Sequence, residues 1–167
     1  MDSLGSGKSG APAPAAAAGK WLGIDYGEAR IGIAVSDTLG ILARGLETIR
    51  WNGKDMAWAL DRITALTWEH GITGLVIGIP RRTDGKPGKP GQSEDKARLM
   101  AALLAEKTGI EPILRDERYT TVLAHRIMRE TGVRTHQRRA VVDQIAAEIL
   151  LQEYLDSLRR DNRRDNA

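Results

Sequence analysis

The order of the apolar patterns constrains the fold of this chain more than any other feature of the sequence. Three strand-like segments follow one another near the start, and helix-like and strand-like segments alternate after them. Strands joined by short connections favour antiparallel pairing, whereas a helix between two strands acts as a crossover that makes them parallel. The sequence therefore predicts an α/β fold: a mixed five-stranded sheet, three antiparallel strands and then parallel strands, with helices on both faces.

The individual elements are predicted from apolar periodicity and turn residues. The predicted strands are Trp21–Asp25, Arg30–Val35, Ile41–Arg50, Leu75–Ile79 and Pro112–Glu117. The predicted helices are Asp55–Glu69, closed by Gly71, then Ser93–Lys107 with Ser93 as its cap, Thr120–Glu130 and Arg138–Leu158. The run at 75–79 is continuously apolar, which is typical of a central strand covered on both faces.

Both ends of the chain differ in composition from the middle. Residues 1–19 are mostly Gly, Ser, Pro and Ala, so we predict a disordered leader there, a folded domain at 20–158 and a charged flexible tail at 159–167. The segment Gly5–Ser9 imitates part of a phosphate-binding loop, but Pro12 and Pro14 follow it. A real loop of that kind needs a strand before it and a helix after it, so we do not predict a nucleotide site.

Composition excludes several classes of site. The chain has no cysteine, which rules out disulfides, thiolate zinc sites and cysteine nucleophiles, and its 3 histidines make an all-histidine metal site improbable. No apolar run approaches the ~20 residues of a membrane span, so we predict a soluble cytoplasmic protein without membrane contact. The formal net charge of +3 is too small to indicate binding driven by overall charge.

Three acids stand where chemistry is expected. Asp25 and Glu117 end predicted strands, and the carboxyl ends of parallel strands form the ligand crevice of an open α/β sheet. The two would lie side by side if their strands were neighbours. Asp143 would approach from the last helix, where the small residues Ala146 and Ala147 allow close packing on the sheet. Each acid alone is also explained as a turn former or a helix cap.

Carboxylates in that arrangement point to a metal-dependent phosphodiesterase. In-line displacement of a phosphodiester by water needs positive charge on the attacking and the leaving oxygen, which two divalent ions about 4 Å apart supply. Such ions prefer oxygen ligands. The sequence therefore predicts Asp25, Glu117 and Asp143 as catalytic residues and ligands of Mg²⁺ or Mn²⁺.

Basic and hydroxyl residues near these acids indicate a nucleic-acid face. The stretch from Arg115 to Arg139 contains seven arginines and three acids. The predicted nucleic-acid contacts are Arg30, Arg81, Arg82, Lys86, Arg118, Tyr119, Thr120, Thr121, Arg138 and Arg139. Simpler roles remain open for them: pairing of Arg30 with Asp25, helix capping by the threonines, packing of the tyrosine, and a solvated linker at 81–91.

Five motifs in order carry a family resemblance. They are Gly23–Gly27, Arg30–Asp37, Gly78–Pro80 with Asp84–Gly85, Asp116–Thr121, and Asp143–Ala147 with Leu150–Gln152. Over about residues 20–157 the chain resembles the YqgF/RuvX family. The resemblance implies a ribonuclease H-like nuclease domain, with Asp25, Glu117 and Asp143 as its acids. It also implies an activity like that of a Holliday-junction resolvase, or maturation of the 5′ end of pre-16S ribosomal RNA.

Two other functions stay open on the sequence alone. One is a nucleic-acid-binding ribosome-assembly factor without catalysis. The other is an actin-like ATP-binding domain, because Asp25-x-Gly27 resembles its phosphate loop, although 167 residues leave no room for the second domain that it needs. The expected partner is RNA, or branched or single-stranded DNA, bound by a monomer or a homodimer.

Overall fold

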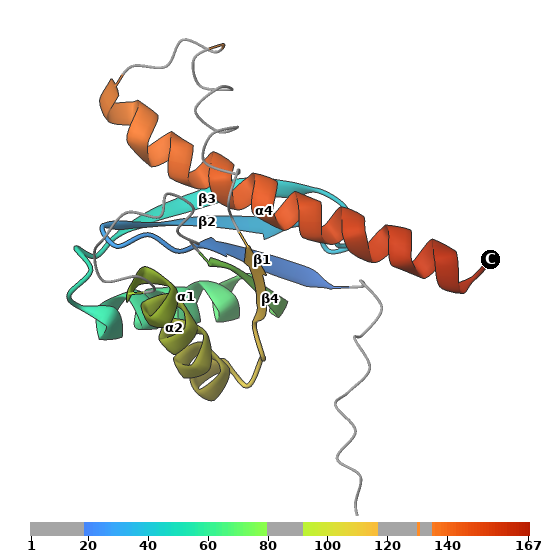
Figure 1. Ribbon diagram of the computed structural model, residues 1–167, viewed down its shortest axis with the longest axis horizontal. Coiled ribbons are helices and arrows are strands. Elements are labelled where there is room, and N and C mark those ends of the chain that lie inside the picture. Colours follow the sequence, from blue (N-terminus) through green and yellow to red (C-terminus); the bar gives the residue numbers. More distant parts are fainter. Residues whose placement is uncertain (1–18, 80–91, 117–129, 131–134) are drawn as a thin grey trace, which may run out of the picture.

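The protein forms a mixed five-stranded sheet in the order β3-β2-β1-β4-β5 (Figure 1). The computed structural model describes residues 19–79, 92–116, 130 and 135–167. β1 (Lys20–Asp25), β2 (Arg30–Ser36) and β3 (Ala43–Arg50) pair antiparallel, whereas β4 (Ile72–Ile79) and β5 (Ile113–Asp116) continue the sheet in parallel from β1. The predicted sheet is confirmed.

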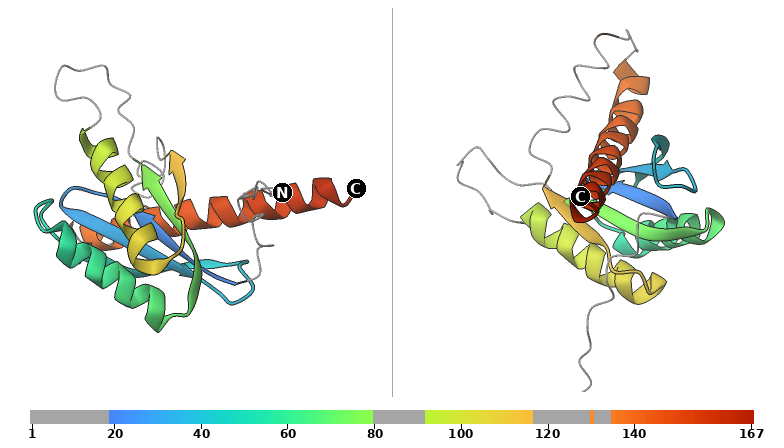
Figure 2. Two further views of the ribbon diagram at one scale, coloured as in Figure 1. Left: turned by 90° about the horizontal axis from the view of Figure 1, so that it is seen from below. Right: turned by 90° about the vertical axis from the view of Figure 1, so that its right-hand side faces the viewer.

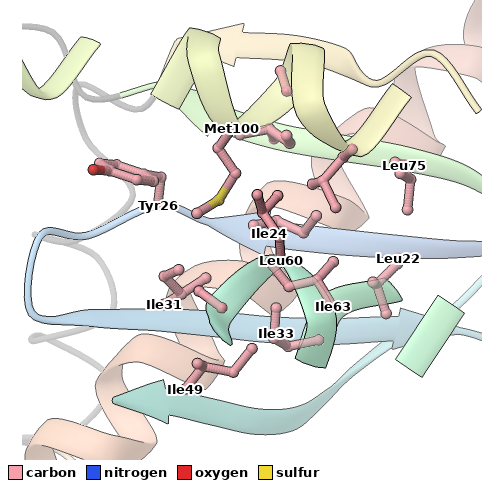
Figure 3. Close-up of a cluster of buried hydrophobic side chains, with 14 of the residues drawn as sticks. Leu22, Ile24, Tyr26, Ile31, Ile33, Ile49, Leu60, Ile63, Leu75 and Met100 are labelled. Atoms are coloured by element: carbon pink, nitrogen blue, oxygen red, sulfur yellow. The ribbon is translucent and has the colours of Figure 1, made fainter. Parts of the chain in front are cut away.

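Helices cover both faces of the sheet, as predicted. α1 (Met56–Glu69) and α2 (Gln92–Thr108) lie on one face, and α4 (Thr135–Asp165) crosses the other (Figures 1 and 2). The core under α1 and α2 is built from branched aliphatic side chains that alternate along the strands (Figure 3). Its fully buried members include Ile24, Ile33 and Ile63. Of the described helices, none is long and apolar enough to cross a membrane.

The face under α4 is made of small residues instead. Gly23 on β1 pairs with Ala34 on β2, which pairs with Gly45 on β3, so small residues form a row across three strands. Two residues before Ala34 on β2, and on the same face of the sheet, a Cβ built on Gly32 would stand 1.9 Å from the carbonyl oxygen of Asp143 in α4. No real side chain tolerates that distance. α4 therefore lies directly on the sheet backbone, with Ala147 fully buried beneath it.

Side chains of α4 also cover the edge of the described sheet. Gln152 Oε1 accepts a hydrogen bond from the backbone N–H of Ala43 at 2.9 Å, and Glu148 Oε2 accepts one from that of Gly45 at 3.0 Å. An edge strand with unpaired backbone groups invites pairing with other chains. These two bonds remove part of that hazard and fix β3 against the helix.

Several predicted boundaries need correction. α4 continues to Asp165, so its predicted end at Leu158 is wrong and residues 159–165 of the predicted tail are helical. The apolar pattern stops at Leu158, but Arg163 and Arg164 in the last turn complement the helix dipole without burial.

α2 begins at Gln92, so Ser93 lies inside it and its hydroxyl donates to Glu28 Oε1 at 2.6 Å instead of capping. The predicted leader up to residue 18 and the helix at 120–130, apart from Glu130 itself, lie outside the described residues.

We expect Gly32→Ala to destabilise the protein through the contact with α4. The added methyl group must displace the backbone at Asp143, and overpacking of this kind costs about 1–3 kcal/mol. Chemical denaturation measures the free energy of unfolding. Gly71→Asn is the control: Gly71 has φ +61° and open space around it, and asparagine tolerates that conformation. A Gly32→Ala variant as stable as the wild type would contradict the close packing.

Candidate functional site

Asp25 ends β1 on the face that α4 covers. Its Cα partner is Gly32 on β2 on one side and Gly78 on β4 on the other. Because both neighbours lack a side chain, the half-buried carboxylate of Asp25 has no bulky residue beside it in that row of the sheet. On the Gly32 side this leaves the space above the strand to the backbone of α4 at Asp143.

Asp143 comes to the same place from α4. Its backbone rests on Gly32, since a Cβ on that glycine would lie 3.2 Å from the Asp143 Cα. Gly32 and Asp25 are cross-strand partners, whose Cα atoms in an antiparallel pair are about 4.5–5.5 Å apart. The structure therefore brings Asp25 and Asp143 together, as predicted, although the two are far apart in the sequence.

Arg30 joins this pair through an ion pair that the sequence did not predict. Its Nε donates to Asp143 Oδ2 at 2.7 Å, with 33% of the Arg30 side chain and 17% of the Asp143 side chain exposed. Pairing with Asp25 was the simpler role left open for Arg30; the ion pair in the structure is with Asp143 instead. The predicted contact of Arg30 with nucleic acid stays a prediction. Arg30 lies two residues before Gly32 on β2, hence on the same face of the sheet, and α4 brings Asp143 over that face.

The strands predicted to end at Asp25 and Glu117 are not neighbours in the sheet. The prediction required neighbouring strands, but β4 separates β1 from β5. Two strand spacings of about 4.8 Å put these backbones about 10 Å apart. Across Gly78, the residue in line with Asp25 on β5 is Arg115, whose guanidinium lies 5.5 Å from the centre of the Tyr154 ring. Glu117 itself lies outside the described residues.

Most of the predicted nucleic-acid contacts also fall outside the described part of the chain. These are Arg81, Arg82, Lys86, Arg118, Tyr119, Thr120 and Thr121. Arg138 and Arg139 belong to the first turns of α4, but their side chains are not described. Their roles in binding stay predictions.

The turn after Asp25 has an anchor that sequence reasoning missed. The indole of Trp51 donates to the carbonyl oxygen of Gly27 at 2.8 Å, and its ring packs edge-on against Tyr26 with centroids 5.8 Å apart. Both aromatic residues are buried in the core under α1 and α2. Burial, with a smaller contribution from Glu28, raises the pKa of Tyr26 to about 12. A tryptophan just after a strand carries no local signal for this contact, which holds the end of β1 in place from the face opposite to α4.

The donor set fits a hard divalent cation. Carboxylate oxygens are the ligands that Mg²⁺ and Mn²⁺ prefer, and the cationic guanidinium of Arg30 on Asp143 shows that positive charge is favoured there. Within the described residues no group of three or more histidines and acids is close enough to hold a metal. Asp25 and Asp143 would supply two ligands, and a further acid such as Glu117 would have to complete the set.

Comparison with known proteins places this architecture in a family. The family model described as "RuvX: Holliday junction resolvase" matches residues 19–157. A protein of Acetivibrio thermocellus named "Putative pre-16S rRNA nuclease" is 46% identical over 136 residues, 81% of this chain and 94% of that protein. Proteins of the same name from Lactobacillus johnsonii and Geobacillus kaustophilus are each 38% identical, over 84% and 83% of this chain and 98% of their own lengths.

Solved structures confirm the predicted fold. Thermus thermophilus RuvC in complex with a Holliday junction substrate has a TM-score of 0.54 at 13% identity, covering 83% of this chain and 94% of that one. The fowlpox virus Holliday junction resolvase has a TM-score of 0.50 at 12% identity, covering 83% of this chain and 99% of that one. At these identities the likeness concerns the fold alone, which is the ribonuclease H-like fold that the motifs implied.

A double-mutant cycle should show that Arg30 and Asp143 are energetically coupled. We expect Arg30→Met, Asp143→Asn and the double variant to give an interaction energy of about 0.5–3 kcal/mol in unfolding, because the pair is largely withdrawn from water. The exposed Arg98–Glu94 pair on α2 is the control and should give about 0.3–0.5 kcal/mol. Additive effects of Arg30→Met and Asp143→Asn would show that the ion pair contributes nothing to the docking of α4.

Proposed function

Since this chain belongs to the RuvX family of Holliday junction resolvases, which are nucleases, we propose that its substrate is pre-16S ribosomal RNA and that it acts in the cytoplasm. The observation that carries this proposal is the 46% identity to a pre-16S rRNA nuclease relative over nearly that protein's whole length. A nuclease role also explains why two acids are held together at a strand end. In a binding module without catalysis, carboxylates beside a phosphate would only repel it.

We propose that Asp25, Asp143 and Glu117 hold one or two divalent ions, Mg²⁺ or Mn²⁺. Bound there, such ions would supply Lewis-acid polarisation of a phosphoryl oxygen and would lower the pKa of a bound water. The protein's own part is to orient the ligands: β1 fixes Asp25, α4 carries Asp143, and Arg30 keeps the Asp143 carboxylate turned toward the sheet. Arg118, Arg138 and Arg139 are proposed to bind substrate phosphates, and Tyr119 to stack on a base.

A second candidate substrate is a four-way DNA junction. The description of the matching family favours it. A junction resolvase cuts two symmetric strands, and that task requires a two-fold symmetric dimer. An enzyme that trims one RNA end has no such requirement. The oligomeric state of the active species therefore separates the two candidates, together with direct comparison of the substrates.

We expect Asp25→Asn and Asp143→Asn each to abolish cleavage while the protein stays folded, because the amide keeps the volume of the side chain and loses the charge that holds a metal. Glu117→Gln should cause a similar loss of cleavage. When several groups act as one unit, removing any one of them costs about as much activity as removing all of them. Cleavage is measured on RNA spanning the 5′ end of 16S rRNA, on linear single strands and on four-way DNA junctions, with Mg²⁺ and with Mn²⁺.

The matched control is Asp61→Asn on α1. Asp61 lies on the opposite face of the sheet, paired with Lys107 at 3.3 Å, and its loss should leave turnover unchanged. Retention of activity in Asp25→Asn at saturating Mn²⁺ would remove Asp25 from the site. Cutting of junctions but not of ribosomal precursor RNA by the wild-type protein would reject the proposed substrate in favour of the second.

A further inference from the structure

The end of α4 projects away from the body of the protein. Leu158 is the last residue of the helix with apolar packing, and from residue 160 onward every residue is exposed. The helix nevertheless continues to Asp165 and extends past the sheet in two directions of view (Figures 1 and 2). The family match ends at residue 157, so these last turns lie beyond it.

This projecting segment is unusually rich in arginine on one side. At 3.6 residues per turn its arginines fall within an arc of about 140°, and Asp161 and Asp165 fall outside that arc. The centre of the arc is opposite the mean direction of the buried face of the helix, which consists of Leu150, Leu151, Tyr154 and Leu155. We call this set the arginine stripe: Arg159, Arg160, Arg163 and Arg164.

Local interactions account for only part of the positive charge of the stripe. Arg159 is paired with Asp156, and a hydrogen bond from Gln152 together with the charges of Arg159 and Arg160 lowers the pKa of Asp156. Within the described residues, Arg163 and Arg164 make no ion pair. The C-terminal end of a helix dipole is equivalent to about half a negative charge. With Arg159 paired to Asp156, the guanidinium groups of Arg160, Arg163 and Arg164 still exceed what the helix needs for its own stability.

The composition of the segment indicates the chemistry of a partner. Residues 159–166 are Arg, Asp and Asn alone, with no lysine and no apolar side chain. Protein interfaces depend on buried apolar or aromatic anchors, which this segment lacks. Guanidinium groups bind phosphate oxygens in a bidentate manner, and phosphate contacts need no apolar anchor. A polyphosphate backbone fits the stripe better than a protein surface does.

We infer that the arginine stripe is a second binding surface for the phosphate backbone of the nucleic acid, remote from the proposed cleavage site and resting on the proposed nuclease function. Asp143 and the stripe belong to one continuous helix, so their separation is fixed. From Asp143 to Arg160–Arg164 the rise of 1.5 Å per residue gives about 26–32 Å along the axis. In a duplex strand with a phosphate every 3.4 Å, that is on the order of nine nucleotides from the cut.

The distance makes a prediction about substrate length. A nucleic acid with about 20 nucleotides on each side of the cleavage site reaches the stripe, whereas one with about four on each side does not. Replacing three stripe residues, in the variant R160Q/R163Q/R164Q, should weaken binding of the long substrate about tenfold or more at low salt. The slope of log affinity against log salt should fall by about two to three units for that substrate alone.

The control is a variant with the same loss of charge on the far face of the sheet. K96Q/R98Q/K107Q replaces three exposed or half-exposed cations of α2. The slope of log affinity against log salt should stay unchanged in this variant for both the long and the short substrate. Cleavage of the short substrate at saturation should be equal in both variants and the wild type. Circular dichroism confirms that α4 stays helical in each.

Three outcomes would overturn the inference. The first is an unchanged salt slope for binding of the long substrate by R160Q/R163Q/R164Q, and the second is an equal loss of affinity for the long and the short substrate. The third is a loss of polyglutamate binding in that variant while RNA binding stays intact, which would assign the stripe to an acidic polypeptide. Failure of the proposed function looks different, because the wild-type protein would then cut neither substrate with Mg²⁺ or Mn²⁺.

Discussion

The contact between α4 and the glycines beneath it is the constraint on which the site depends. At Gly32 the helix backbone lies where any Cβ would have to be, and at Gly23 and Gly45 a Cβ would stand 2.8 Å and 3.0 Å from α4 side chains. A helix normally packs on a sheet through interdigitating side chains, which keep the two backbones apart. Here the direct approach brings an acid on the helix beside an acid at the end of the central strand.

That approach concentrates negative charge, and the surrounding structure compensates for it. Arg30 supplies a cation to Asp143 in a pair that is mostly withdrawn from water. On the opposite face the end of β1 is held by Trp51 through the Gly27 carbonyl. Asp25 is thus fixed by the core under α1 and α2, and Asp143 by the packing of α4, so the two carboxylates are positioned by different parts of the molecule. Such preorganisation from two sides is what a metal-binding pair of acids requires.

The sequence was informative wherever local pattern decides structure. The hairpin, the place of Asp25 at a strand end and the helix–strand alternation of the described residues follow from periodicity and turns, and these are confirmed. Strand order is not local: nothing in the segment at 113–116 shows that β4 separates it from β1. The acid that pairs with Arg30 depends on which helix crosses β2, so the sequence alone could offer Asp25 as a partner but could not identify Asp143. The end of α4 was misjudged because the apolar pattern stops at Leu158, whereas charges beyond it are enough to continue the helix.

The central claim is that the seating of α4 makes one cation site from Asp25 and Asp143. Calorimetric titration of the full chain with Mn²⁺ tests it without any substrate. The wild-type protein should bind Mn²⁺, and Asp25→Asn and Asp143→Asn should each weaken Mn²⁺ binding at least about tenfold. The double variant should bind Mn²⁺ little more weakly than either single variant, because the two acids belong to one site. Mn²⁺ affinity that is the same in the wild type and both single variants would contradict it.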